Sequence, residues 1–167
     1  MTAVAHAGFT LVRDYPAAIT DLWAAFAVEE RKRDWFGGGD EWTPHEWRFD
    51  FRVGGLDVDE ARFHNGVLSR YEARYTDIVE HTRIVTSYDM WIDGVHISTS
   101  VASYEFERLA EGSRLTHTEH GVHLDGLDDG ASREYGSRLL LDALGRTFAS
   151  PNEDGGPSGS GTLGTGA

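Results

Sequence analysis

Between residues 46 and 123 the chain alternates apolar and polar side chains with a period of two. In the first such segment, charged residues alternate with four apolar ones, Trp47, Phe49, Phe51 and Val53. Turn dipeptides separate the segments, and Asn65-Gly66 and Asp93-Gly94 supply the positive φ angles that tight hairpins need. We therefore expect an antiparallel meander of six strands, near 46–53, 56–63, 67–79, 83–92, 95–108 and 114–123.

Different periodicities flank this meander. A strand near 6–13 opens the chain, a helical stripe follows from Ile19 to Phe26, and a second short helix covers 29–35. After Leu124 a second apolar stripe predicts a helix of about 20 residues, with Asp125 or Asp128 as its N-cap. The predicted fold class is α+β, in the order β-α-α-β6-α, with a curved antiparallel sheet of about seven strands wrapped around the long C-terminal helix.

Composition narrows the classes of partner. The 28 acidic and 15 basic residues give a net charge of -13, which argues against binding to nucleic acid or to an anionic membrane surface. The run Arg31-Lys32-Arg33 is the basic cluster of the chain, and we expect it on the exposed face of the second helix. There is no cysteine, no long apolar run and no signal peptide, so we expect a cytoplasmic protein. We expect one domain over residues 1–149 and a disordered Gly/Ser-rich tail over 150–167.

Three motifs add to this pattern. They are Tyr15-Pro16-Ala17 with the following Leu22–Phe26 and Trp35-Phe36, the segment Asp50-Phe51-Arg52-Val53-Gly54-Gly55, and Gly136 with Leu140–Leu144 and Phe148. Together they resemble the START-like, birch-pollen-allergen-like superfamily of helix-grip proteins. Within it, they resemble the subgroup named for the activator of heat-shock-protein-90 ATPase. The tryptophan usual in that family after the helix glycine is Ser137 here. This difference trims the contact between helix and sheet and is expected to widen the space between them.

The resemblance implies an apolar cavity of some 300–1,000 Å³ between the sheet and the long helix. We expect a small hydrophobic ligand there, without a cofactor or a metal. The side chains expected to contact it are Trp35, Trp47, Phe49, Phe51, Tyr71, Tyr75, Tyr88, Met90, Tyr104, Leu140 and Leu144. Members of the superfamily include carriers, polyketide cyclases and dehydratases, and a co-chaperone domain, so the fold leaves the function open.

The last strand carries the candidate catalytic pair. If the face of Leu115 points inward, His117 and Glu119 are neighbours on the cavity wall. A carboxylate beside an imidazole orients it and raises its basicity, so this pair suits general-base catalysis on a hydrophobic carbonyl substrate. The alternative is that both side chains are solvated or simply bond to each other. A metal site is not expected, because His120 faces away and His117 and His123 lie ~13 Å apart along a strand.

Several alternatives stay open at this stage. Trp35 and Phe36 are either a mobile flap or a helix end packed on the sheet, and the Tyr88 and Tyr104 hydroxyls face either a ligand or a buried carbonyl. In strand 95–108, the turn places Val95, Ile97 and Val101 inside, whereas the later apolar set is Ala102, Tyr104 and Phe106, so a bulge or a longer turn is required.

A homodimer is an open alternative. Contact with a chaperone is not expected, since the chain carries one domain.

Overall fold

The computed structural model of the protein describes residues 3–37 and 39–149. The predicted tail at 150–167 lies outside the described residues. The elements in chain order are β1 (Val4–Tyr15), α1 (Ile19–Ala27), α2 (Glu29–Arg33), the 3₁₀ turn η1 (Gly39–Glu41), β2 (Trp42–Phe49), β3 (Leu56–Phe63), β4 (Leu68–Val79), β5 (Arg83–Ile92), β6 (Val95–Arg108), β7 (Ser113–Leu124) and α3 (Gly130–Thr147). The predicted α+β order is confirmed.

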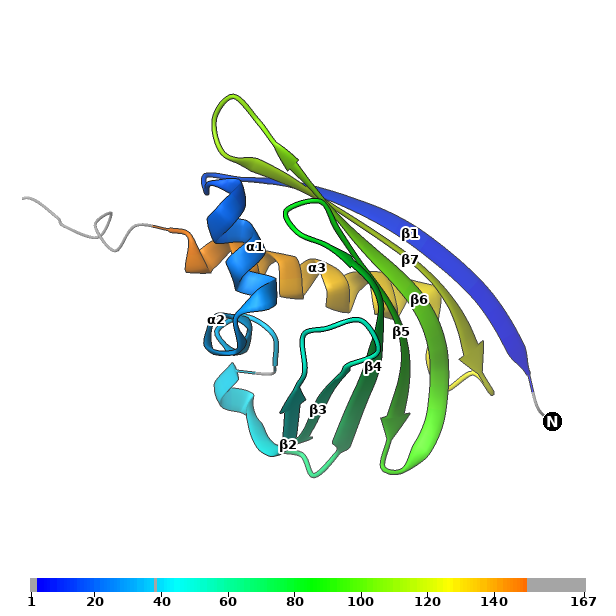
Figure 1. Cartoon of the computed structure of the whole chain (residues 1–167). Helices are drawn as coiled ribbons and strands as arrows, with labels where there is room; N and C mark the ends of the chain where they lie inside the picture. Colours follow the sequence, from blue (N-terminus) through cyan, green and yellow to red (C-terminus); the bar gives the residue numbers. More distant parts are fainter. Residues whose placement is uncertain (1–2, 38, 150–167) are drawn as a thin grey trace, which may run out of the picture.

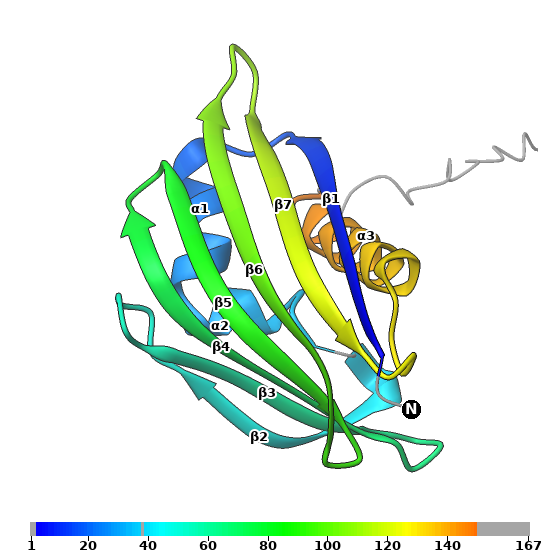
Figure 2. The same cartoon turned by 90° about the vertical axis from the view of Figure 1, so that its right-hand side faces the viewer.

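One antiparallel sheet of seven strands, in the order β1-β7-β6-β5-β4-β3-β2, bends around the helices (Figure 1). Sequential hairpins pair β2 through β7, and β1 pairs with β7 at the far edge. The chain therefore crosses from one edge of the sheet to the other between β1 and β2, and α1 and α2 make that crossing on the concave side (Figure 2). None of the described helices is long and apolar enough to cross a membrane.

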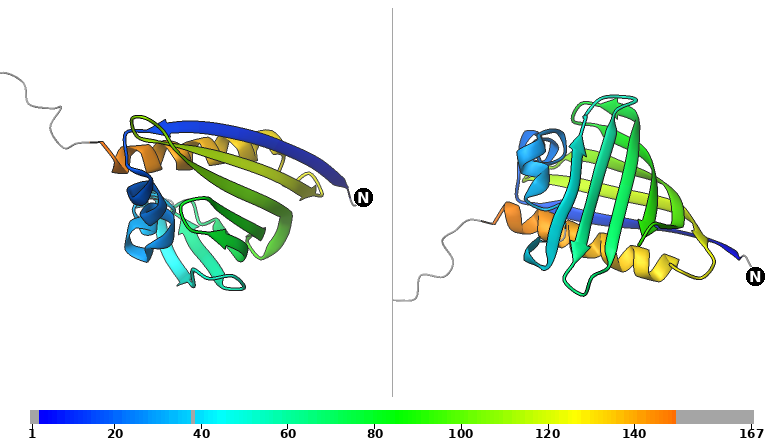
Figure 3. Two further views of the ribbon diagram at one scale, coloured as in Figure 1. Left: turned by 45° about the horizontal axis from the view of Figure 1, so that its top comes forward. Right: turned by 90° about the horizontal axis from the view of Figure 1, so that it is seen from below.

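Helix α3 runs alongside β1 on the concave side of the sheet (Figure 3). Its N-cap is Asp129, whose carboxylate accepts a hydrogen bond of 2.7 Å from the Ser132 amide, so the expected caps Asp125 and Asp128 are wrong. Asp125 has a positive φ of 56° in the preceding turn, which excludes it as a cap. Further along, the Tyr15 hydroxyl donates to the Leu141 carbonyl at 2.8 Å and ties the helix to β1.

The first meander strand differs from the prediction. It covers 42–49 rather than 46–53, so Phe51 and Val53 lie in the turn that follows. In that turn a Cβ on Gly55 would stand 2.0 Å from the Asp50 carbonyl oxygen, so only glycine fits there. The Gly54 amide donates to the Tyr75 carbonyl at 2.7 Å. The glycine-rich motif is thus a tight turn fastened to β4, which sequence alternation alone does not distinguish from a strand.

A bulge resolves the conflict in β6. The pairing of β5 with β6 shifts between Met90 and Trp91, which leaves Ile97 without a partner on β5. Ile97 and Ser98 are therefore both buried, and the inward parity changes from that point on. Val95 and Val101 are exposed, whereas Ala102, Tyr104 and Phe106 face the interior. The bulge alternative is confirmed.

Candidate functional site

The concave face of the sheet is lined by aromatic side chains from adjacent strands. The rings of Tyr71 on β4 and Tyr88 on β5 lie 4.9 Å apart, and the ring of Tyr104 on β6 stacks on His117 of β7 at 4.4 Å. Tyr71, Tyr104 and Met90 keep partial exposure although they face inward. The interior surface is therefore aromatic and still reached by solvent.

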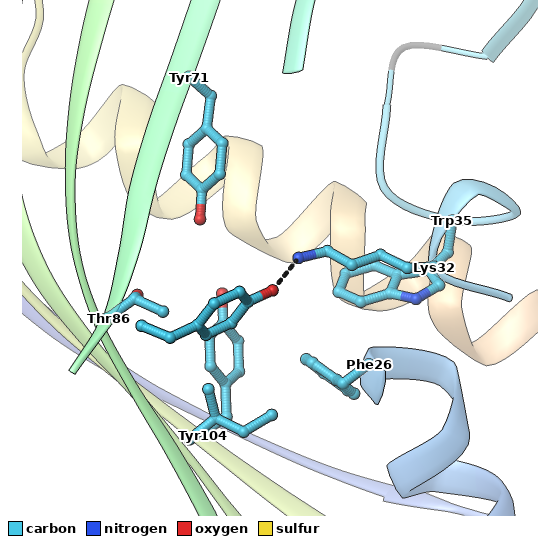
Figure 4. A pocket seen from close by; sticks show the side chains of 8 residues that line it. Phe26, Lys32, Trp35, Tyr71, Thr86 and Tyr104 are labelled. Carbon is cyan, nitrogen blue, oxygen red and sulfur yellow. Dashed lines mark hydrogen bonds between the residues drawn. The ribbon is translucent and has the colours of Figure 1, made fainter. Parts of the chain in front are cut away.

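A small cavity lies at one end of this surface, beneath α1 and α2 (Figure 4). Its lining includes Phe26, Lys32, Trp35, Tyr71, Tyr75, Ile84, Thr86 and Tyr104. Its volume is about 10 Å³, which is room for about one water molecule. This pocket is far smaller than the expected 300–1,000 Å³, because aromatic rings from α1, α2 and the sheet fill the space.

The position of Lys32 contradicts the prediction that the Arg31-Lys32-Arg33 cluster lies on the exposed face of the second helix. Its side chain is buried, with an ion pair to Asp57 on β3, and its ammonium lies 4.4 Å from the centre of the Phe36 ring. The Tyr75 hydroxyl donates to the same Asp57 oxygen at 2.9 Å. The signal in the sequence is the spacing of Lys32 from Trp35 and Phe36, three and four residues on, which places all three on one side of the chain.

A second carboxylate stands beside this pair. Asp59 follows Asp57 on the same face of β3, two residues along. Burial, and then the nearby Asp57 carboxylate, raise the pKa of Asp59 from its ordinary value of 3.8 to about 6, against the opposing effect of Lys32. The α2 end of the concave face therefore holds one buried cation and two carboxylates.

A larger polar network occupies the opposite end, where α3 begins. Arg133 donates to the Tyr88 hydroxyl at 2.8 Å and to Ser98 at 2.7 Å, and it forms ion pairs with Glu119 and Asp128. Arg133 and Glu119 are both buried. Sequence reasoning missed Arg133 because its partners come from β5, β6, β7 and the turn before α3.

His117 and Glu119 are both buried on the inward face, as the parity of Leu115 predicts. His117 Nε2 lies 3.8 Å from Glu119 Oε2, which is beyond hydrogen-bond range. His117 Nδ1 lies 3.2 Å from the Ser103 carbonyl, and Glu119 accepts a 2.6 Å bond from the Tyr88 hydroxyl. Burial lowers the pKa of His117, although the Ser103 carbonyl and Glu119 oppose that shift. The imidazole is therefore neutral at pH 7.

The other predicted contact residues divide into three groups. Trp35, Tyr71, Tyr75 and Tyr104 line the small cavity, and Tyr88, Met90 and Leu140 lie on the adjoining inner surface. Four pack elsewhere in the core or under α2: Trp47, Phe49, Phe51 and Leu144.

Trp35 is a packed helix end rather than a free flap, since its indole N–H donates to the Ala25 carbonyl at 2.9 Å. Within the described part of the chain, the Tyr88 hydroxyl bonds to Glu119 and Arg133 rather than to a backbone carbonyl. Sequence reasoning missed Phe26, Ile84 and Thr86 as lining residues, although the helical stripe had placed Phe26 in the core. Among the described residues, no group of three His, Asp or Glu side chains is placed to hold a metal.

Comparison with known proteins fits this geometry. Residues 16–149 match the family model described as Activator of Hsp90 ATPase homolog 1-like protein. The chain belongs to this family. No match was found among curated proteins.

Several solved structures are similar to this chain. A protein from Rhizobium leguminosarum superimposes with a TM-score of 0.84 at 32% identity, over 89% of this chain and 97% of that one. A protein from Rhizobium loti is 40% identical, with a TM-score of 0.80 over 86% and 98% of the two chains. The family member from Aeromonas hydrophila, described as AHSA1-like, has a TM-score of 0.63 at 19% identity, over 84% and 90%. The last of these shows the shared fold alone.

Replacing Arg133 with methionine tests the network at the start of α3. The variant leaves the buried Glu119 carboxylate without its cation, so we expect the free energy of unfolding to fall by about 3–5 kcal/mol in urea titrations. Arg138→Met is the matched control, because the exposed pair of Arg138 with Glu134 contributes about 1 kcal/mol or less. Equal losses in the two variants would contradict a role for the network.

The variant Asp59→Asn tests whether the raised pKa of this carboxyl group makes the stability of the protein depend on pH. With a pKa near 6 in the fold and 3.8 as its ordinary value, the folded state binds more protons between these values. The contribution of Asp59 to the stability of the wild type therefore falls as the pH rises from about 4 to 6, and the variant lacks this contribution. We expect the unfolding free energy of Asp59→Asn, relative to wild type, to rise across that range and stay level above it. An unchanged difference at every pH, or the same rise in the exposed control Asp40→Asn, would refute this.

Proposed function

We propose that the protein binds a small hydrophobic molecule on the concave face of its sheet, beside α3. The observation that carries this proposal is the partial exposure of Tyr71, Met90 and Tyr104, three large side chains that face the interior. Large apolar surfaces that stay in contact with water inside a fold are typical of ligand sites. The charged groups at either end leave this aromatic stretch as the apolar part of the face.

The packing of α3 supports the same site. Its buried stripe is Arg133, Ser137, Leu141 and Leu144, so a small polar side chain stands midway along the helix where it faces the sheet. The resemblance places a tryptophan at that position in the family. With serine there, the helix fills less of the space above the aromatic surface.

The size of the small cavity sets how such a ligand binds. A volume of about 10 Å³ admits a single atom group and not a ring. The body of the ligand therefore lies along the partly exposed surface, in a site that is open to solvent, and only one end of it reaches the cavity.

Ser137→Trp tests this location. The indole fills the space assigned to the ligand, so we expect binding of the neutral dye Nile red, followed by its fluorescence, to weaken about tenfold or more. The control is Leu139→Trp on the exposed side of the same helix, which should bind the dye like wild type. Thermal unfolding of both variants checks that the fold is intact. Wild-type protein that binds no dye, or equal binding by the two variants, would sink the proposal.

Catalysis by His117 is the second candidate, and the orientation of its ring favours it. Because Nδ1 faces a carbonyl oxygen, that nitrogen carries the proton, and Nε2 keeps its lone pair. A neutral imidazole with a free lone pair, buried against the aromatic surface, has the protonation state of a general base.

His117→Gln tests this role. With 2-naphthyl acetate as substrate, we expect kcat/KM for hydrolysis to fall about 100-fold, since the amide keeps the shape of the ring and removes the base. His120→Gln, on the exposed face of the same strand, is the control and should leave the rate unchanged. Turnover that is absent in wild type, or equal in both variants, would exclude catalysis by this residue.

A further inference from the structure

Two polar groups of the small cavity beneath α1 and α2 have hydrogen-bonding capacity that the described residues do not use fully. These are the ammonium of Lys32 and the hydroxyl of Thr86, and both line the cavity among aromatic rings (Figure 4). The rest of the lining is aromatic or aliphatic, apart from the tyrosine hydroxyls. An apolar wall with a few converging polar groups is how proteins fix the orientation of a small ligand.

Counting the protons on Lys32 leaves one donor over. An ammonium has three N–H groups. One pairs with Asp57, and a second lies 3.4 Å from the Tyr75 hydroxyl oxygen. No third hydrogen bond of the ammonium is found among the described residues, and its nitrogen lies 4.4 Å from the centre of the Phe36 ring.

Thr86 is the second free group. Its side chain is 3% exposed, and its hydroxyl oxygen is buried without a hydrogen-bond partner among the described residues. Unpartnered buried hydroxyls are uncommon, because each one loses the bond it would make with water. A group that enters the cavity and bonds to Thr86 restores that lost hydrogen bond.

The local charge selects what kind of group that is. Lys32 and Asp57 cancel each other, and Asp59 adds further negative charge on the same face of β3. An anionic group is therefore opposed by the carboxylates, and a cationic one by Lys32. A neutral acceptor oxygen meets neither obstacle.

We propose that this cavity receives the carbonyl oxygen of a neutral hydrophobic ketone or ester, bound by Lys32 and Thr86 while the apolar body lies against Tyr71 and Tyr104. The volume of about 10 Å³ suits one such oxygen. This inference rests on the proposed function and names the chemical class of its ligand.

Three matched compounds test it by calorimetry: 2-acetylnaphthalene, 2-ethylnaphthalene and 2-naphthoate. They share one ring system and differ in carrying a ketone, a methylene or a carboxylate at the same place. We expect wild-type protein to bind the ketone roughly tenfold or more tightly than the hydrocarbon, because a hydrogen bond from an ammonium is stronger than a neutral one. The carboxylate should bind more weakly than the ketone.

Thr86→Val removes the hydroxyl and keeps the shape, and it should fold well because the lost group has no partner. We expect the preference for the ketone over the hydrocarbon to fall roughly fivefold in this variant. Thr118→Val, whose hydroxyl bonds to Thr10 outside the cavity, should keep the full preference. The infrared carbonyl band of bound 2-acetylnaphthalene should lie at lower frequency in wild type than in Thr86→Val.

The outcomes separate the two proposals. Failure of all three compounds to bind refutes the hydrophobic site itself. Equal binding of ketone and hydrocarbon leaves that site standing and overturns the carbonyl subsite, with a trapped water as the occupant of the cavity. Tightest binding of the carboxylate assigns the cavity to anions instead. An equal preference in Thr86→Val and Thr118→Val excludes Thr86 as a donor.

Discussion

The concave face of the sheet carries buried carboxylates that helices must neutralise. Asp57 meets Lys32 from α2, and Glu119 meets Arg133 from α3. A carboxylate buried without a counter-ion destabilises a fold by several kcal/mol, so the sheet closes only when both helices bring their cations to it. The position of each helix over the sheet follows from this requirement as much as from apolar packing.

These two pairs also divide the interior. Charge is confined to the two ends of the concave face, and the stretch between them is built from tyrosines, Met90 and the imidazole of His117. Asp57 and Glu119 are each bonded to a cation and to a tyrosine hydroxyl. A hydrophobic molecule that lies on the tyrosines therefore meets few unsatisfied charges, which suits a site for a neutral ligand.

Membership in the family leaves chemistry undecided, because helix-grip proteins share a frame and differ in what fills it. In this chain, two single side chains influence what the site can bind. Ser137 is a small side chain on the buried stripe of α3, and Thr86 has a buried hydroxyl without a hydrogen-bond partner among the described residues. Each is a single side chain that alters the site and leaves the hydrogen bonding of the sheet unchanged.

The order of elements, the inward faces of β4, β5 and β7, and the inward position of His117 and Glu119 were determined by the sequence alone. The alternation of side chains along a strand is a local property, and it identifies the buried face without any knowledge of the partner. The tertiary structure decided the burial of Lys32, the Arg133 network, the bulge at Ile97 and the small size of the cavity. Each of these depends on how segments far apart in the chain pack together, such as α2 against β3 or α3 against β5. The spacing of residues along one strand or helix carries no information about which distant segment packs against it.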